Sequence, residues 1–330
     1  MRPVARSSFG FLPLLRRTLL TGALLLAASP AIDASSGDNP RPEPLPERQV
    51  IAGPSVFSNP DISWSPEIGR YIELYSGPAG LNYISRSLRA GLPYRDFIVQ
   101  QLEARRMPRE LYYLALIESN FDATAVSRSG AVGLWQFMEN SVEEWMVINA
   151  EVDERRDFYR STHAALEKLA WNFTVLEDWL LAIAAYNAGL GHVRRAIESA
   201  GTRDYWRLAE AGLLPDQTVD YVPKFLAIAW IAEHGGRHGL PCYWLEPLEW
   251  TRVEAPGGIE LDTIAELAGI PTDALHSWNL HLNKRRTPVG SVTYPLNAPL
   301  RYHGRLESAV DIVSPYDTLI ERSRSADSTQ

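Results

Sequence analysis

Residues 111–118 read LYYLALIE, an apolar run that ends in a carboxylate. The run is apolar on every face of a helix, which predicts a helix buried in the middle of a domain. Glu118 continues that helix, because with Leu111, Leu114 and Ala115 it completes the i, i+3, i+4, i+7 spacing of one helical face. A carboxylate in such surroundings loses hydration, so we expect a raised pKa and a protonated side chain near neutral pH.

A carboxyl group that stays protonated near neutral pH is suited to general acid catalysis. The alternative for Glu118 is a place at the end of the helix, where it faces water or pairs with an arginine. The stretches that follow Glu118 in the chain favour the first interpretation.

The stretch GLWQ at 133–136 has the composition of a sugar-binding segment, and a polar loop with Ser127 and Ser129 precedes it. Glycine lets the backbone come close to a ligand. Gln136 offers both the donor and the acceptor that sugar hydroxyls require. Among the tryptophans we expect Trp135 to lie near such a cleft, with packing in the core as the alternative.

A second apolar helix is predicted over WLLAIAA at 179–185, and it ends in YNAG at 186–189. This pattern places a tyrosine and an amide, Tyr186 and Asn187, at the C-terminus of a buried helix.

Glu118-Ser119, GLWQ at 133–136 and AYNAG at 185–189 resemble the three motifs of the family 1 lytic transglycosylases, in the same order and with similar spacings. The two serines of the polar loop and YVPK at 221–224 fit the same pattern. The resemblance covers residues 66–240 strongly and 245–300 weakly. Three motifs in register form a specific signal, whereas one alone would be weak.

The resemblance implies a mainly α fold, with a lysozyme-like helical catalytic domain. It also implies cleavage of the β-1,4 bond between N-acetylmuramic acid and N-acetylglucosamine in peptidoglycan. In this family the 6-hydroxyl of the muramic acid, and not water, attacks the anomeric carbon and leaves a 1,6-anhydro product. Glu118 would protonate the glycosidic oxygen first and then accept the proton of the 6-hydroxyl.

The roles of the other residues also come from the resemblance. Tyr186 would form a hydrogen bond at the catalytic centre and help to orient Glu118. The residues expected to bind substrate are Ser127, Ser129, Gln136, Tyr186, Asn187, Gln217 and Tyr221. Alternatives remain for three of them: the two serines would then be plain loop residues, and Asn187 a helix cap.

One position departs from the family pattern. Many members have E-T-x-x-Y-V near the end of the domain, where this chain reads QTVDYV at 217–222. Gln217 keeps the shape and the hydrogen-bonding capacity of the glutamate but lacks its charge. An electrostatic role of this position is therefore in doubt, and Asp216 is the neighbour that could compensate.

Ordinary glycosidases use two carboxylates. Asp122, Glu139, Glu143 and Glu144 follow Glu118, but no spacing nominates one of them as its partner. This pattern gives weak support to a mechanism with a single acid.

The chain divides into five parts. Residues 1–34 are predicted to be a signal peptide, because four arginines precede the apolar run TLLTGALLLAA and small residues follow it. The run of 11 residues is shorter than the roughly 20 that a membrane-anchoring helix needs. A Pro-rich linker at 35–65, the catalytic domain at 66–240, a small domain at 245–312 and a flexible tail at 313–330 follow.

The signal peptide predicts a periplasmic protein. No cysteine follows the apolar run, so a lipoprotein anchor is not expected. Arg16 and Arg17 loosely resemble a twin-arginine signal, which leaves two export routes open.

Helices are expected almost throughout the catalytic domain, without strand-like alternation. Pro66, Pro93 and Pro108 each precede an amphipathic stretch, and proline suits the first turn of a helix. Further helices are predicted near 161–176, 178–188, 191–200 and 218–234.

The small domain resembles a degenerate lysin motif, a βααβ module that binds N-acetylglucosamine chains. The residues in register with that motif are Gly258, Leu261, Ile264, Ala265, Gly269, Ile270, Leu275 and Asn279. Ile259 and Glu260 replace the usual Asp-Thr pair, so the glycan-binding loop is altered. A plain packing domain is the alternative.

Charge and composition exclude several classes of function. The net charge is −8, and because residues 1–34 carry four arginines against one aspartate, the rest of the chain is more acidic still. An acidic body argues against a nucleic-acid partner. The single cysteine, Cys242, can form no intramolecular disulfide. His234 and His238 are separated by two glycines that break the helix a metal site of this spacing needs, so neither a metal nor a cofactor is expected.

The expected partner is therefore the peptidoglycan glycan strand, bound by a monomer, with proteins of cell-wall synthesis or division as candidate partners. Two alternatives stay open. One is a hydrolytic muramidase, and the other is a peptidoglycan-binding scaffold without activity, against which the presence of Glu118 argues.

Overall fold

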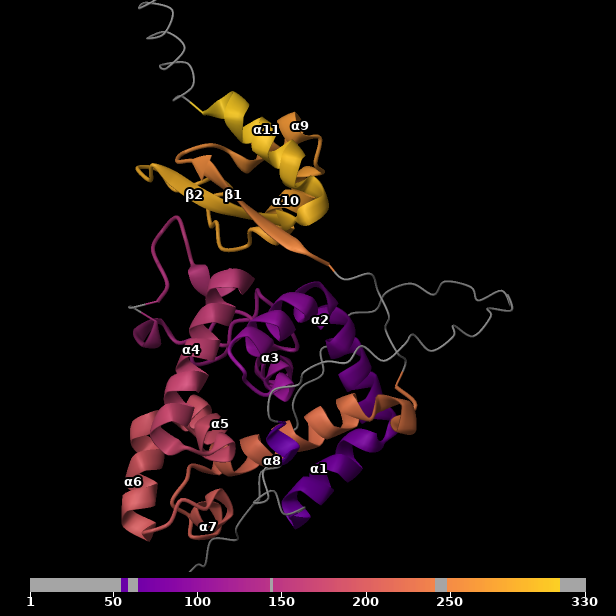
Figure 1. Ribbon diagram of the computed structural model, residues 1–330, viewed down its shortest axis with the longest axis vertical. Coiled ribbons are helices and arrows are strands. Elements are labelled where there is room, and N and C mark those ends of the chain that lie inside the picture. Colours follow the sequence, from indigo (N-terminus) through magenta and orange to yellow (C-terminus); the bar gives the residue numbers. More distant parts are fainter. Residues whose placement is uncertain (1–54, 59–64, 143–144, 241–247, 315–330) are drawn as a thin grey trace, which may run out of the picture. The chain divides into compact units, whose positions relative to one another are not determined.

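The structure is a computed structural model that describes residues 55–58, 65–142, 145–240 and 248–314. The predicted signal peptide and tail lie outside the described residues, apart from the tail's first two positions, and so does most of the predicted linker. Within that linker, Val56–Ser58 form a 3₁₀ turn whose Val56 is buried in the main core, so this part is not a plain linker. The described part is mainly helical with a single two-stranded sheet, which confirms the predicted mainly α class (Figure 1).

Two α-helices begin the helical region. α1 (Pro66–Ser76) has Pro66 in its first turn, as predicted, and Ser65 caps it by accepting a hydrogen bond from the Ile68 amide. α2 (Pro78–Ala104) runs straight through Pro93. The prediction of a helix start at Pro93 is therefore wrong: apolar residues on both sides of it are buried in one core, and this burial offsets the hydrogen bond that proline cannot donate.

The predicted central helix is confirmed, but its first turn is tighter than expected. Residues Arg109–Tyr112 form a 3₁₀ turn, and α3 (Tyr113–Ser119) continues from it. Leu111, Leu114 and Leu116 have no exposed surface. Asn120 ends the helix in the left-handed conformation at φ 58°. The carboxylate that ends the apolar run therefore lies in the last turn of a buried helix.

The second half of the helical region begins after a long irregular segment. The helices predicted here are confirmed to within three residues, while a short one, α7, was not predicted. They are α4 (Phe158–Leu176), α5 (Trp179–Ala188), α6 (Leu190–Ala200), α7 (Tyr205–Glu210) and α8 (Asp216–Glu233). Aspartates 157, 178 and 204 cap α4, α5 and α7 by accepting amide hydrogen bonds of 2.8–2.9 Å.

Residues 250–313 build a second, smaller hydrophobic core. The elements follow in the order β1 (Trp250–Pro256), α9 (Leu261–Ala268), α10 (Thr272–Trp278), β2 (Thr293–Pro299) and α11 (His303–Val313). β1 and β2 pair antiparallel with Val253 opposite Leu296 (Figure 1). Leu261, Ile264 and Leu306 pack with both of them in one cluster of buried side chains.

Residues 149–157, just before α4, contact this small domain. The Asp153 amide donates to the carbonyl of His281 at 2.9 Å, and Val152 forms a β-bridge with Leu282. The fully buried Asp157 accepts hydrogen bonds from Asn297 on β2 and, at 3.3 Å, from Arg252 on β1. The helical region and the small domain therefore share buried polar contacts.

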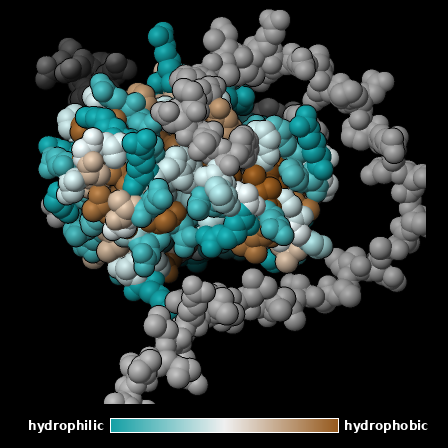
Figure 2. Space-filling model, turned by 90° about the horizontal axis from the view of Figure 1, so that it is seen from below, coloured by the Kyte–Doolittle hydropathy of each residue, from teal (hydrophilic) through white to brown (hydrophobic). Residues whose placement is uncertain are grey.

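The described helices include none that is both long enough and apolar enough to cross a membrane. On the face seen in Figure 2, hydrophilic residues predominate and the hydrophobic ones form small separate patches.

Candidate active site

Glu118 lies in the last turn of α3 and is only partly accessible to solvent. Its Oε1 atom accepts a hydrogen bond of 2.5 Å from the hydroxyl of Tyr221, which comes from α8. Tyr221 is itself buried. Two elements that are about a hundred residues apart in the chain therefore hold this carboxylate between them.

Burial raises the pKa of Glu118 from 4.5 to about 7. The hydrogen bond from Tyr221 and the positive charges of Lys168 and Lys224 act in the opposite direction and limit the rise. The raised pKa agrees with the expectation from the sequence. A carboxyl group with a pKa of about 7 can both give and take a proton near neutral pH.

The two tyrosines have different roles from those predicted. The hydroxyl of Tyr186, at the end of α5, donates to the carbonyl of Trp135 at 2.9 Å and not to Glu118. Tyr186 therefore makes its hydrogen bond to the backbone of the GLWQ stretch, and any effect on the orientation of Glu118 is indirect. Tyr221, predicted to bind substrate, makes the contact with Glu118 instead.

The GLWQ stretch is fixed from three directions. Gly133 has φ +85°, and a Cβ added there would meet the Arg155 carbonyl oxygen at 1.9 Å, so only glycine fits. The Ser119 hydroxyl, next to Glu118, donates to the Leu134 carbonyl at 2.8 Å. Trp135 is fully buried and donates to Thr162, so its predicted alternative role in the core is the correct one.

The polar residues predicted to bind sugar lie in or beside this stretch. The Gln136 amide nitrogen donates to the carbonyls of Gly133 and Ala125 at 3.0 and 3.3 Å, which holds the loop closed. The hydroxyls of Ser127 and Ser129 are 3.0 Å apart on its exposed side. The Ser127 oxygen also accepts from the Ala131 amide.

The last two predicted residues lie near the start of α8. The Asn187 side-chain oxygen accepts a hydrogen bond of 2.8 Å from the Thr218 hydroxyl. Gln217 is exposed, one helical turn before Tyr221 on the same helix, and its neighbour Asp216 is exposed too.

Two lysines that act on Glu118 were missed from the sequence. Lys168 lies on α4 with its ammonium nitrogen 4.6 Å from the centre of the Tyr186 ring, and Lys224 lies on α8. A signal existed for the first: Lys168 is four residues after Ala164 and four before Asn172, both buried, so helical spacing puts it on the buried side.

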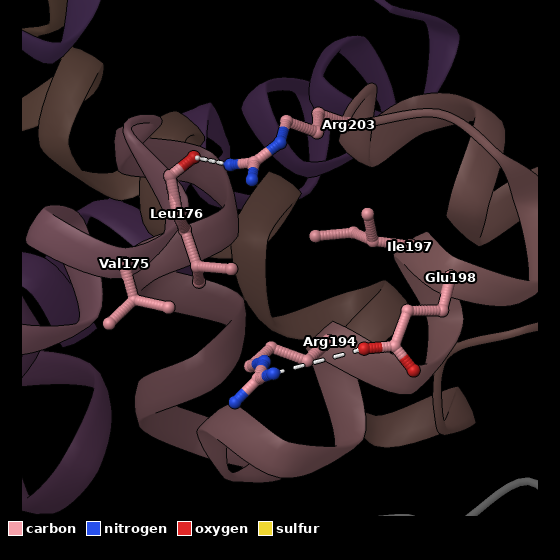
Figure 3. Close-up of a pocket in the computed structure, with 6 residues that line it drawn as sticks. All are labelled: Val175, Leu176, Arg194, Ile197, Glu198 and Arg203. Carbon is pink, nitrogen blue, oxygen red and sulfur yellow. Dashed lines mark hydrogen bonds and ion pairs between the residues drawn. The ribbon is translucent and has the colours of Figure 1, made fainter.

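A pocket of about 430 Å³ lies between the end of α4 and α6, away from these residues. Figure 3 shows its lining side chains, and its two arginines already have partners: Arg203 donates to the Leu176 carbonyl and Arg194 pairs with Glu198. In the described part of the chain, no group of three or more His, Cys, Asp or Glu side chains is placed to hold a metal ion.

Comparison with known proteins points to the same stretches. Residues 97–209 match the family model described as the transglycosylase SLT domain. Over 194 residues, 57% of its length, the chain is 35% identical to the membrane-bound lytic murein transglycosylase D of Escherichia coli (strain K12). The match covers 42% of that protein, so the chain spans less than half the length of this relative.

Two other relatives match shorter parts of the chain. A protein of Alteromonas sp. (strain M-1) named for tributyltin chloride resistance is 41% identical over 109 residues, 32% of this chain and 53% of that protein. The membrane-bound lytic murein transglycosylase F of Desulfosudis oleivorans is 39% identical over 90 residues, 25% of this chain and 19% of that protein.

Proposed function

We propose that this chain, in which residues 97–209 match the transglycosylase SLT domain, is a family 1 lytic transglycosylase. It cleaves peptidoglycan between N-acetylmuramic acid and N-acetylglucosamine and leaves a 1,6-anhydro product. Glu118 is the catalytic acid and then the catalytic base. As an acid it gives its proton to the glycosidic oxygen while the bond to the anomeric carbon breaks. As a base it takes the proton of the 6-hydroxyl while that oxygen bonds to the same carbon.

The observation that carries this proposal is the environment of Glu118. Its pKa of about 7 suits both proton transfers, since the protonated and ionised forms are then close in free energy near neutral pH. Among the described residues, the groups that shift this pKa are Tyr221, Lys168 and Lys224, and no carboxylate is one of them. A single carboxyl group supports intramolecular attack better than hydrolysis by a carboxylate pair.

The remaining site residues have binding roles in the proposal. Ser127, Ser129, Gln136, Asn187 and the exposed Gln217 contact the sugar substituents. Tyr186 acts indirectly, since its hydrogen bond to Trp135 holds the GLWQ stretch in place. Tyr221 keeps the Glu118 carboxyl group oriented.

The finer features belong to the same proposal. Residues 1–34 act as a signal peptide for export to the periplasm, where the chain works as a monomer on glycan strands. The strand–helix–helix–strand order of β1, α9, α10 and β2 supports a lysin-motif-like module.

The experiment is digestion of purified sacculi by the mature chain, from about residue 35 onward, and by its Glu118→Gln variant, with mass analysis of the products. The wild type should release muropeptides lighter by one water than the hydrated species, and the variant should release none. Hydrated products would assign a muramidase instead. Sacculi that bind both proteins without release of fragments would assign a scaffold.

A further inference from the structure

Lys168 is a half-buried charged residue on α4. Its ammonium nitrogen lies 4.6 Å from the centre of the Tyr186 ring and 5.7 Å from that of Phe137. It also donates a long hydrogen bond of 3.4 Å to the Tyr186 carbonyl. Two aromatic rings and one carbonyl therefore fix the position of this charge.

Placing an ammonium group there costs free energy, because burial removes its hydration. Burial lowers the pKa of Lys168, and in the described part of the chain the charge that raises it again is that of Glu118. The coupling is reciprocal, since Lys168 lowers the pKa of Glu118. The hydroxyl of Tyr186, whose ring holds this cation, donates to the Trp135 carbonyl, and Ser119, the residue after Glu118, donates to the neighbouring Leu134 carbonyl. The cation therefore lies on the part of the site that adjoins Glu118.

The groups that face Glu118 come from three elements. α8 contributes Tyr221 and Lys224, α5 contributes Tyr186, and α4 contributes Lys168. Lys224 interacts with two carboxylates, because both Glu118 and Asp220 raise its pKa. Lys168 is the cation whose charge acts on Glu118 without such a second carboxylate among the described residues.

We propose that Lys168 is a positioning residue whose ammonium group stabilises the Glu118 carboxylate formed when the leaving oxygen takes its proton. This inference rests on the proposed function. As the glycosidic bond breaks, its electron pair stays on the leaving oxygen, which receives the proton and leaves Glu118 negatively charged. Lys168 stabilises that charge until the 6-hydroxyl gives up its own proton and its oxygen closes the anhydro ring.

The test compares full-length chains that carry Lys168→Met, Lys168→Arg or no substitution. Methionine keeps much of the aliphatic length without the charge, and arginine keeps the charge. The pH dependence of kcat and of kcat/KM is measured on soluble peptidoglycan oligosaccharides. For Lys168→Met we expect a kcat about tenfold lower, and an alkaline limb of the profile that moves up by about one pH unit. Lys168→Arg should keep the wild-type limb.

The inference would be overturned if Lys168→Met kept the wild-type alkaline limb and lost activity only because less of the protein was folded. Lys168 would then have a packing role alone. If that variant does not fold, Lys168→Gln supplies the neutral side chain for the same comparison. Failure of the proposed function looks different, since the wild type itself would then give no anhydro product. In that case, an isotope-edited titration of the Glu118 carboxyl group still tests the coupling: an unaltered midpoint on removal of the Lys168 charge would contradict it.

Discussion

Glu118 lies in the last turn of a helix whose other side chains are mostly apolar and buried. Its side chain loses hydration there and is held by one short hydrogen bond from Tyr221. The two lysines nearby prevent a still larger rise of its pKa. Burial raises the pKa of Glu118 and these three groups lower it, and the balance sets a pKa of about 7.

Replacing Tyr221 by phenylalanine tests this balance. The variant loses the hydrogen bond that stabilises the ionised form of Glu118, so the pKa of Glu118 should rise further. We expect kcat to fall roughly 10- to 100-fold and the alkaline limb of the pH profile to move upwards. A profile with an unshifted alkaline limb would show that the hydroxyl of Tyr221 does not act on Glu118 during turnover.

Ionisation of Glu118 should lower the free energy of unfolding at high pH. Its pKa in the folded state lies above 4.5, so ionisation is harder in the folded than in the unfolded chain, and stability is lost as pH rises from about 4.5 through about 7. Glu118→Gln should therefore stabilise the fold by about 2 kcal/mol at pH 8, less than the full shift because the side chain is partly exposed.

Chemical denaturation of both proteins at pH 4 and pH 8 checks this expectation. At pH 4 the carboxyl group is protonated in the folded state and largely so in the unfolded one, so the gain should nearly vanish. An equal gain at both pH values would contradict the assignment of the raised pKa to Glu118.

At the residue scale, the sequence indicated that the Glu118 carboxyl group has an unusual environment but not how its neighbours are arranged. The apolar spacing around Glu118 predicted its burial and raised pKa. The direction of a tyrosine hydroxyl depends on side-chain rotamers and on the packing of distant helices, which spacing does not contain. For that reason the sequence did not indicate that Tyr221 contacts Glu118 directly, or that the Tyr186 hydroxyl bonds to the Trp135 carbonyl.

The segment between α3 and α4 is the element that presents the GLWQ stretch. Its backbone passes so close to Arg155 that Gly133 has no room for a side chain. Arg155 is buried and pairs with Asp153 through two hydrogen bonds of 2.9 Å. The loop that carries the GLWQ stretch therefore packs against a buried ion pair.

Gly133→Ala should damage this element, and Gly130→Ala is its matched control. Both glycines have φ near +85 to +88°, but nothing lies within 4 Å of a Cβ at Gly130. The control carries the backbone cost of about 1 kcal/mol, whereas Gly133→Ala adds the overlap with Arg155 and should lose about 3 kcal/mol or more. Denaturant midpoints and cleavage rates of both variants measure the difference. Equal losses would contradict the close approach.

At this scale, the sequence predicted where helices occur better than it predicted the residues at which they begin and end. The helices after residue 158 follow from apolar periodicity and aspartate caps, and they match closely. α2 shows the limit, since proline at position 93 favours a helix start while the burial of Phe97, Ile98 and Leu102 favours continuity. Tertiary packing decided the outcome, and it is not visible in a local window of sequence.

At the scale of the whole molecule, residues 149–157 join the helical region to the small domain. Asp157 caps α4 by accepting from the Tyr159 amide, and it also accepts from Asn297 and Arg252 of the small domain. The buried carboxylate of Asp157 thus bonds to both the helical region and the small domain. We expect the two to unfold together in one calorimetric transition.

Asp157→Ala tests this coupling, with Asp204→Ala as the control that removes an exposed cap and a surface ion pair with Arg207. The buried variant loses a cap and two contacts to the small domain and should cost about 3 kcal/mol, or roughly 5 °C in Tm. The control should cost about 1 kcal/mol. A separate early transition of the small domain in the wild type would contradict the expectation.

The measurement that tests the account most directly is a titration of the Glu118 carboxyl carbon in the intact wild-type chain, assigned by comparison with Glu118→Gln. A midpoint of about 7 is predicted, because burial outweighs the stabilising contacts of Tyr221, Lys168 and Lys224. A midpoint near the ordinary value of 4.5 would leave Glu118 ionised at neutral pH and would contradict its role as the acid.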